Sequence, residues 1–297
     1  MRVFVTGASG FVGSAIVKEL LQAGHTVLGL VRSDSGAEKV ATAGADVYRA
    51  NINDLPAIQK ATEGCDAVIH TAFNHDDFSR FKQNCEDDRK VVEALGDALA
   101  GSNRPLVITS GVGVVGITGR TVTEDDKPAK PNFNPRTATE EATDAVAEKG
   151  VKSYILRLPP TTHGQGDHGF VPMIIDMAKQ KGESAYIGDG QNRWPATHRF
   201  DAAAMYRFII EQQPEQRIFH AVAEEGITFR DIATAIGNGL GIPVVSKEGE
   251  AAQAHFGWFL HFAGMGCLAS SEKSRNTLGW CATNPTLMED LVPGIYL

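Results

Sequence analysis

Three glycines near the start of the chain are spaced for binding a phosphate group. Residues 5–13 read Val-Thr-Gly-Ala-Ser-Gly-Phe-Val-Gly, so Gly7, Gly10 and Gly13 form a G-x-x-G-x-x-G pattern. In dinucleotide-binding proteins the first glycine permits a tight turn, the second lets the backbone approach a diphosphate, and the third allows close helix–sheet packing. A helix that begins here adds N–H groups and the positive end of its dipole. Placed between a predicted strand and a predicted helix, the pattern indicates a dinucleotide site.

The end of the second predicted strand indicates which dinucleotide is bound. Proteins that prefer NAD place Asp or Glu there to hold the ribose 2′-hydroxyl. Here residues 30–33 read Leu-Val-Arg-Ser, so Arg32 and Ser33 stand where the acid would be. Arg32 can pair with a 2′-phosphate and stack on adenine; in the alternative it is a solvated surface side chain near Asp34. We therefore predict NADP as the cofactor, with NAD as the alternative.

The elements that would hold this loop alternate between strand and helix. Apolar strands are predicted at residues 2–6, 26–31, 46–50, 67–70, 105–109 and 153–158, and helices at 10–23, 87–99 and 135–149. This alternation predicts an α/β protein with a doubly wound parallel sheet of the Rossmann type, covered by helices on both faces.

Beyond residue 158 the alternation becomes irregular. We expect residues 1–165 to form the NADP-binding domain, which residues 199–225 rejoin. Residues 166–198 and 226–297 are expected to form a smaller C-terminal lobe on the substrate side.

Composition and charge argue against several classes of protein. The 297 residues are 42% hydrophobic and 22% charged, as in ordinary globular proteins. The net charge of −8 argues against nucleic acid or an anionic membrane as a partner. The four cysteines lie far apart with no His at metal-ligand spacing, so we expect reduced thiols and no metal. Without a signal peptide or a stretch of about 20 apolar residues, a cytoplasmic location is expected, and a homodimer is possible.

Four segments resemble the extended short-chain dehydrogenase/reductase superfamily, the group often labelled NAD-dependent epimerase/dehydratase. They are the glycine loop, Asp-Ala-Val-Ile-His-Thr-Ala at residues 66–72, Leu-Arg-Leu-Pro at 156–159 and Leu-Gly-Trp at 278–280. The resemblance covers nearly the whole chain and implies that residues 71–73 lie along the cofactor and residues 158–162 near the nicotinamide. The predicted cofactor-binding residues are Gly7, Ser9, Gly10, Phe11, Val12, Gly13, Arg32, Ser33, Asn51, Ile52, Thr71, Ala72, Phe73, Thr109, Ser110, Arg136, Leu158, Pro159 and Thr161.

The resemblance does not extend to the catalytic Tyr-x-x-x-Lys pair. In the family the Tyr moves a proton at the substrate oxygen, while the Lys lowers the Tyr pKa and holds the nicotinamide ribose. No Tyr occurs between Tyr48 and Tyr154. Alignment through Glu140 puts Asn132 at the Tyr position and Arg136 at the Lys position, so the chain is most similar to atypical members that keep the cofactor loop.

Three other residues are candidates for the chemistry. Ser110 is the hydroxyl nearest to the family's serine position, on which alignment places Gly111. His163 follows the sixth predicted strand, and an imidazole has an ordinary pKa near 6.5, suited to proton donation. Arg136 would hold the ribose without transferring a proton, because a guanidinium stays charged near neutral pH. We predict Ser110, His163 and Arg136 as the catalytic residues, with a bound water as the alternative proton source.

These residues favour one function over two others. The favoured function is NADPH-dependent reduction of a small aldehyde or ketone with a proton donor other than Tyr, since hydride transfer requires only a cofactor held beside a carbonyl. The first alternative is a protein that binds NADP(H) or senses redox state without turnover. A sugar-nucleotide epimerase or dehydratase is less favoured, because those reactions depend on the absent Tyr.

Overall fold

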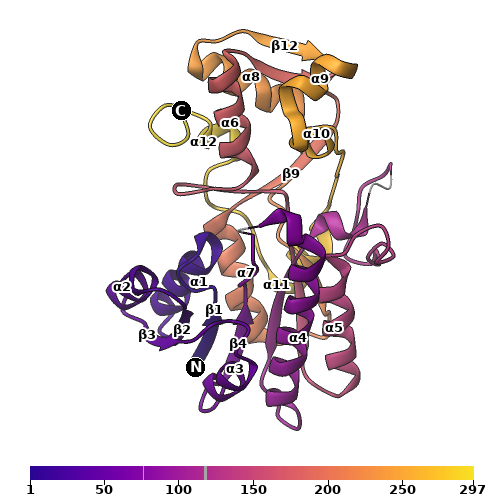
Figure 1. Cartoon of the computed structure of the whole chain (residues 1–297). Coiled ribbons are helices and arrows are strands. Elements are labelled where there is room, and N and C mark those ends of the chain that lie inside the picture. The colour runs from indigo at the N-terminus through magenta and orange to yellow at the C-terminus, as the bar shows by residue number, and fades with distance from the viewer. Residues whose placement is uncertain (76, 117–118) are drawn as a thin grey trace.

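A parallel sheet forms the centre of the larger part of the molecule. The computed structural model describes residues 1–75, 77–116 and 119–297, and in these ranges seven strands pair in the order β10-β6-β5-β4-β1-β2-β3 (Figure 1). All of their pairings are parallel. The strands are β1 (Arg2–Thr6), β2 (Thr26–Val31), β3 (Asp46–Arg49), β4 (Ala67–His70), β5 (Leu106–Gly111), β6 (Ser153–Leu158) and β10 (Ile218–His220). The prediction of a Rossmann-type sheet is confirmed.

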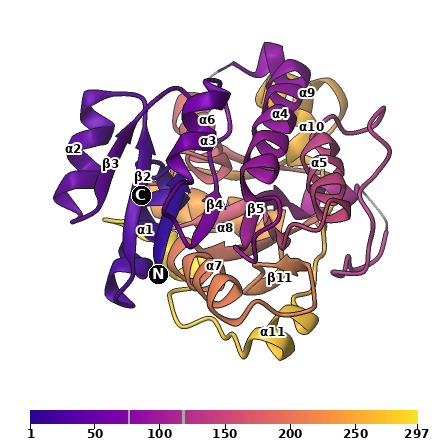
Figure 2. The same ribbon diagram turned by 90° about the horizontal axis from the view of Figure 1, so that it is seen from below.

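Helices cover both faces of this sheet because each buries an apolar stripe. On one face lie α1 (Phe11–Gln22), α2 (Asp34–Thr42) and α7 (Arg199–Gln212), which share a buried core with the sheet. On the other lie α3 (Leu55–Ala61), α4 (Phe81–Leu99) and α5 (Thr137–Glu148). Figure 2 shows α3, α4 and α5 on the side of the sheet opposite to α7. Ile16 and Leu20 of α1, four residues apart on one helical face, are both fully buried.

A smaller lobe stands over the carboxyl ends of the strands (Figure 1). One sheet has the order β11-β9-β7, and β12 pairs with β8. The strands are β7 (Thr161–His163), β8 (Ser184–Ile187), β9 (Arg193–His198), β11 (Glu224–Thr228) and β12 (Val244–Lys247). The helices are α6 (Phe170–Lys181), α8 (Phe229–Leu240), α9 (Gly249–Phe256), α10 (Leu260–Ala263) and α12 (Leu287–Asp290), while α11 (Glu272–Leu278) packs near β10. Trp194, Phe229 and Phe259 are fully buried in this lobe's aromatic core.

The short elements are those that the sequence pattern does not predict. The helices α2, α3 and α9–α12 span four to nine residues each, too few turns for a clear helical period. The strand β7 occupies residues for which no strand was expected, and it exists because it pairs with β9. Among the described residues, none of the helices combines the length and apolar character needed to cross a membrane.

Candidate functional site

The glycine loop joins β1 to α1 and leaves the first turn of α1 open. Gly7 has φ of 68°, and a Cβ there would lie 2.7 Å from Oγ1 of Thr71. A Cβ on Gly13 would lie 2.0 Å from the carbonyl oxygen of Gly7, so both positions need glycine. Gly10 is exposed and precedes α1 without capping it by a side chain. The first N–H groups of α1 therefore have no intrahelical acceptor, which fits an anion such as a diphosphate.

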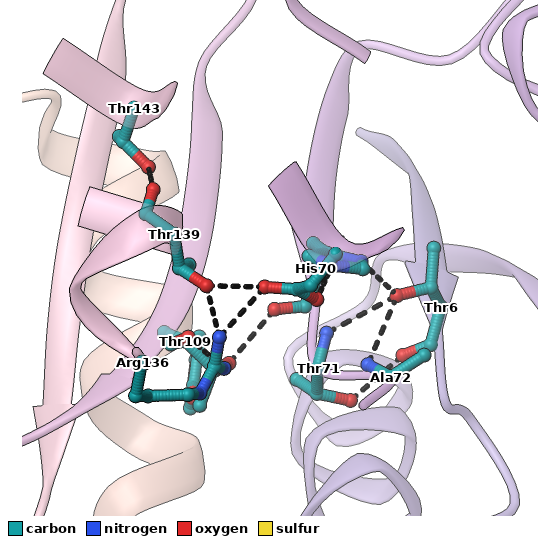
Figure 3. A network of polar contacts seen from close by, with 10 residues as sticks. Thr6, His70, Thr71, Ala72, Thr109, Arg136, Thr139 and Thr143 are labelled. Carbon is teal, nitrogen blue, oxygen red and sulfur yellow. Dashed lines mark hydrogen bonds and ion pairs between the residues drawn. The ribbon is translucent and has the colours of Figure 1, made fainter. Parts of the chain in front are cut away.

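Thr6, the last residue of β1, ties the end of β4 to this loop. Its Oγ1 accepts hydrogen bonds from the backbone N–H groups of Thr71 (3.1 Å) and Ala72 (3.2 Å). The Thr71 hydroxyl donates to the Thr6 carbonyl at 2.7 Å. Thr71 and Ala72 thus lie beside Thr6, the residue that precedes the glycine loop (Figure 3).

A buried chain of polar groups runs from Thr6 to Arg136. Nδ1 of His70 lies 2.7 Å from Thr6 Oγ1, and Nε2 of His70 lies 3.0 Å from the carboxylate of Asp88. The hydrogen-bond pattern is satisfied when the Thr6 hydroxyl donates to Nδ1 and Nε2 donates to Asp88. The second Asp88 oxygen accepts from Arg136 at 2.7 Å and from Thr139. Burial raises the pKa of Asp88, but Arg136 and His70 outweigh it and hold this pKa well below its usual range.

Arg136 immediately precedes α5 in the chain, and its side chain contacts the C-terminal half of β5. One guanidinium nitrogen donates to the Thr109 carbonyl at 3.2 Å, and the guanidinium carbon lies 4.1 Å from the ring centre of Phe73. Its side chain is 17% exposed. The structure therefore brings Arg136, Thr109 and Phe73 together at the carboxyl ends of β4 and β5, where open α/β sheets bind ligands. A ribose hydroxyl can accept from this guanidinium.

The Ser110 side chain does not join the group formed by Arg136, Thr109 and Phe73. Neighbouring residues of a strand point to opposite faces, and Ser110 is directed toward α5, where its hydroxyl donates to Glu140 at 2.6 Å. Glu140 in turn pairs with Arg157 at 2.7 Å, and both side chains are at most 1% exposed. Ser110 therefore completes a buried ion pair and cannot polarise a substrate carbonyl from this position.

His163 is also separated from the site by burial. It is fully buried on β7, and its Nδ1 lies 2.7 Å from the carboxylate of Asp290. Its Nε2 is buried without a hydrogen-bond partner in the described part of the chain. The Thr161 hydroxyl is likewise buried and donates to the Pro195 carbonyl. A ring without exposed surface has no path for a proton to a substrate, so this geometry does not support His163 as the proton donor.

The predicted cofactor-binding residues that follow β2 and β3 are mostly exposed. Arg32 is exposed after β2, and the Ser33 hydroxyl caps α2 by accepting from the Gly36 N–H at 3.1 Å. Asp34 pairs with Arg49 at 2.6 Å. Asn51 is exposed and accepts from the N–H of Asn53 at 3.0 Å. The other predicted residues fall into two sets: Ser9, Phe11, Val12, Ile52 and Leu158 are half-buried, whereas Pro159 is buried.

The sequence prediction missed Asp88, the counter-ion of Arg136. The signal was present, because Asp88 shares a helical face with Val91, Val92 and Leu95, all of them buried. An acid on the buried face of a helix requires a buried partner. The identity of that partner is not available from local spacing, since Arg136 lies 48 residues away.

His220 is buried and contacts Arg157, the cation of the Glu140–Arg157 pair. Nε2 of His220 is 3.3 Å from an Arg157 nitrogen, and its Nδ1 is 2.8 Å from the Ser270 carbonyl oxygen. Nδ1 therefore carries the proton, and Nε2 accepts from Arg157. Burial and, second, the Arg157 charge lower the pKa of His220 to about 4, although the hydrogen bond to the Ser270 backbone and the charge of Glu140 oppose this.

Removing the charge of Asp88 is expected to destabilise the fold. Asp88→Asn leaves Arg136 without its counter-ion, which should lower the free energy of unfolding by about 3–5 kcal/mol in urea denaturation. The neighbouring control Asp87→Asn, which breaks a surface pair with Lys90, should change it by less than about 1 kcal/mol. Adding Arg136→Met to Asp88→Asn should cost less than the sum of the two single changes. Additive losses would contradict a coupled pair.

The buried His220 predicts a pH dependence of stability. Its pKa is about 4 in the folded chain and near 6.5 when unfolded, so between these values only the unfolded chain binds the proton. Stability should therefore fall as the pH drops from 6.5 to 4, by at most about 3 kcal/mol from this group. In His220→Gln, whose amide can also accept from Arg157, urea denaturation across pH 4–7 should show a smaller slope. An unchanged slope would show that His220 does not contribute.

Comparisons with known proteins agree with this geometry. The model of the NAD dependent epimerase/dehydratase family matches residues 3–221. An uncharacterized protein of Schizosaccharomyces pombe is 48% identical over 296 residues, with 100% of both chains covered. The sterol-4-alpha-carboxylate 3-dehydrogenase (decarboxylating) of Dictyostelium discoideum is 27% identical, covering 78% of this chain and 74% of its own.

A solved structure shows the same fold. The UDP-glucuronic acid 4-epimerase of Bacillus cereus, in complex with UDP-glucuronic acid and NAD, superposes with a TM-score of 0.78 at 17% identity, covering 100% of this chain and 98% of its own. The family match spans the glycine loop, the Asp88–Arg136 pair and every strand of the main sheet. This chain belongs to the NAD dependent epimerase/dehydratase family.

Proposed function

We propose that this protein is an NADPH-dependent reductase of a small aldehyde or ketone. The observation that supports this most is the Arg136 guanidinium, which the buried Asp88 holds beside Thr109 and Phe73 at the carboxyl ends of β4 and β5. The resemblance places the Lys that holds the nicotinamide ribose at this position. A cation there positions a nicotinamide. Alignment puts Asn132, not Tyr, at the family's Tyr position, which disfavours the acid–base steps of epimerases and dehydratases.

The preference for NADP rests on the charges after β2. Asp34, the nearest acid, is the first residue of α2 and pairs with Arg49, so it does not stand at the end of β2, where NAD-preferring proteins place the acid that holds the ribose 2′-hydroxyl. Arg32 and the N-terminus of α2, which begins after Ser33, instead present a cation and helix N–H groups. Both favour the extra 2′-phosphate of NADP.

The proposed mechanism divides the work between cofactor, protein and water. When bound, the reduced nicotinamide would supply the hydride that adds to the carbonyl carbon and reduces the carbonyl to an alcohol. Arg136 would hold the ribose and stabilise negative charge that develops on the substrate oxygen. Ser110 and His163 are buried in other contacts, and a guanidinium does not serve as a proton donor near neutral pH. We therefore assign the proton that completes the alcohol to a water molecule.

A second candidate, binding of NADP(H) without turnover, is favoured by one observation. Among the residues assigned to the site, none is both exposed to substrate and able to donate a proton near neutral pH. Oxidation of NADPH measured against a panel of aldehydes and ketones separates the two functions. Tight NADPH binding with no oxidation above the rate in buffer would favour the binding function.

The cofactor preference predicts the effect of reversing one charge. Arg32→Asp should weaken NADPH binding by roughly 2–3 kcal/mol, through a lost charge-assisted contact and new repulsion of the 2′-phosphate. NADH binding should change little. The control Arg230→Asp makes the same charge change at an exposed position of the smaller lobe and should leave both affinities unaltered. If nicotinamide fluorescence titration finds equal affinities for NADH and NADPH in the wild type, the preference is wrong.

The role of Arg136 predicts a graded response of turnover. Arg136→Gln should lower kcat/KM for NADPH-dependent reduction by about 10²-fold, the scale of a lost stabilising donor. Arg136→Lys, which restores the residue found in the family, should retain most activity. Arg89→Gln on the surface of α4, where Arg89 pairs with Glu86 and Glu141, is the matched control. Equal turnover in the wild type and Arg136→Gln would exclude the proposed role.

A further inference from the structure

Arg199, the first residue of α7, has contacts that the glycine motif does not explain. Its guanidinium carbon lies 5.1 Å from the ring centre of Phe11 and 4.9 Å from that of Phe200. Phe11 is the first residue of α1 and directly follows Gly10. A cation from the second half of the chain is therefore held beside the open first turn of the glycine-loop helix.

One polar group of Arg199, its Nε–H, is buried and unsatisfied. Within residues 1–75, 77–116 and 119–297 its guanidinium has no hydrogen bond and no ion pair, and its Nε is buried without a partner. Asp167 is a nearby acid, but its carboxylate accepts from the Gly169 N–H at 2.7 Å and from the Tyr296 hydroxyl at 2.6 Å. Burial lowers the pKa of Arg199, while Tyr296 and Asp167 oppose this. A partly desolvated cation without an anionic partner is costly for the fold.

The glycine loop has no cationic side chain of its own, and Arg199 supplies one. A dinucleotide diphosphate carries two negative charges, whereas residues 7–14 contain no Lys or Arg. The open N–H groups of α1 offer hydrogen bonds and a partial charge only. A guanidinium adds a full charge and a planar set of donors that matches phosphate oxygens.

We propose that Arg199 binds the diphosphate of the dinucleotide and closes the site over the first turn of α1. This inference rests on the dinucleotide site of the proposed function and is independent of the preference for NADP. The diphosphate is common to NADH and NADPH, so Arg199 contributes equally to both. Arg32 contributes to the difference between them.

Titration of the apoprotein with NADH and with NADPH tests this assignment. Arg199→Gln should weaken both by about tenfold or more and leave their ratio unchanged, whereas Arg32→Asp changes the ratio. Arg199→Lys, which keeps the charge, should recover part of the loss. Arg193→Gln, an exposed Arg of β9 bonded to the Gly226 carbonyl, is the matched control. Wild-type affinities in a folded Arg199→Gln would overturn the assignment, and a substrate phosphate would then be the remaining anion.

A measurement on the wild type guards against a variant that fails to fold. In the ¹⁵N-labelled protein, the Arg199 Nε–H signal is assigned by its loss in Arg199→Lys. ADP-ribose, which carries the diphosphate without a nicotinamide, should shift this signal, and free nicotinamide should not. An unmoved signal at saturating ADP-ribose would refute the contact alone. Failure of NADH, NADPH and ADP-ribose to bind the wild type at all would refute the dinucleotide site itself.

Discussion

The buried carboxylate of Asp88 is the interaction on which the site depends. It faces a cation, Arg136, on one side and His70 on the other, and it is almost fully removed from water. A lone buried charge would be prohibitively costly, so the three groups must be assembled together. Through Thr6 the same chain reaches the glycine loop. One polar network inside the protein thus joins the glycine loop to Arg136 (Figure 3).

Strand β5 directs two neighbouring side chains to opposite faces of the main sheet. Thr109 bonds to the hydroxyl of Tyr206 on α7, and the next residue, Ser110, bonds to Glu140 on α5. Glu140 and Arg157 form a pair whose side chains are at most 1% exposed. Ser110 donates to Glu140, and Arg157 also donates to His220 and to the Asp126 carbonyl. The Asp88–Arg136 pair lies at the carboxyl ends of β4 and β5. The other holds α5 against β6, so a residue beside the family's serine position has a structural task.

The smaller lobe is coupled to the cofactor side through a few contacts of the last segment. Asp290 holds His163, and Tyr296 holds both the Gly164 N–H and Asp167. These bonds fix the loop after β7 close to Arg199 and α1. Because α7 and α1 also pack along each other on the sheet, the orientation of Arg199 follows from packing of the larger part of the molecule as well as from the smaller lobe.

The sequence by itself determined the α/β alternation and the position of the glycine loop, because these depend on local periodicity and on glycine spacing. It also made Arg136 a candidate, through its alignment with the Lys position of the family. The tertiary structure decided which polar groups meet. Ser110 and His163 are well placed along the chain, yet their side chains are buried on Glu140 and Asp290. Asp88 and Arg199 belong to no sequence motif. The role inferred for each depends on partners or neighbours that are distant in sequence. The physical reason is that the cost of an unpaired buried charge depends on three-dimensional neighbours, which no spacing along the chain specifies.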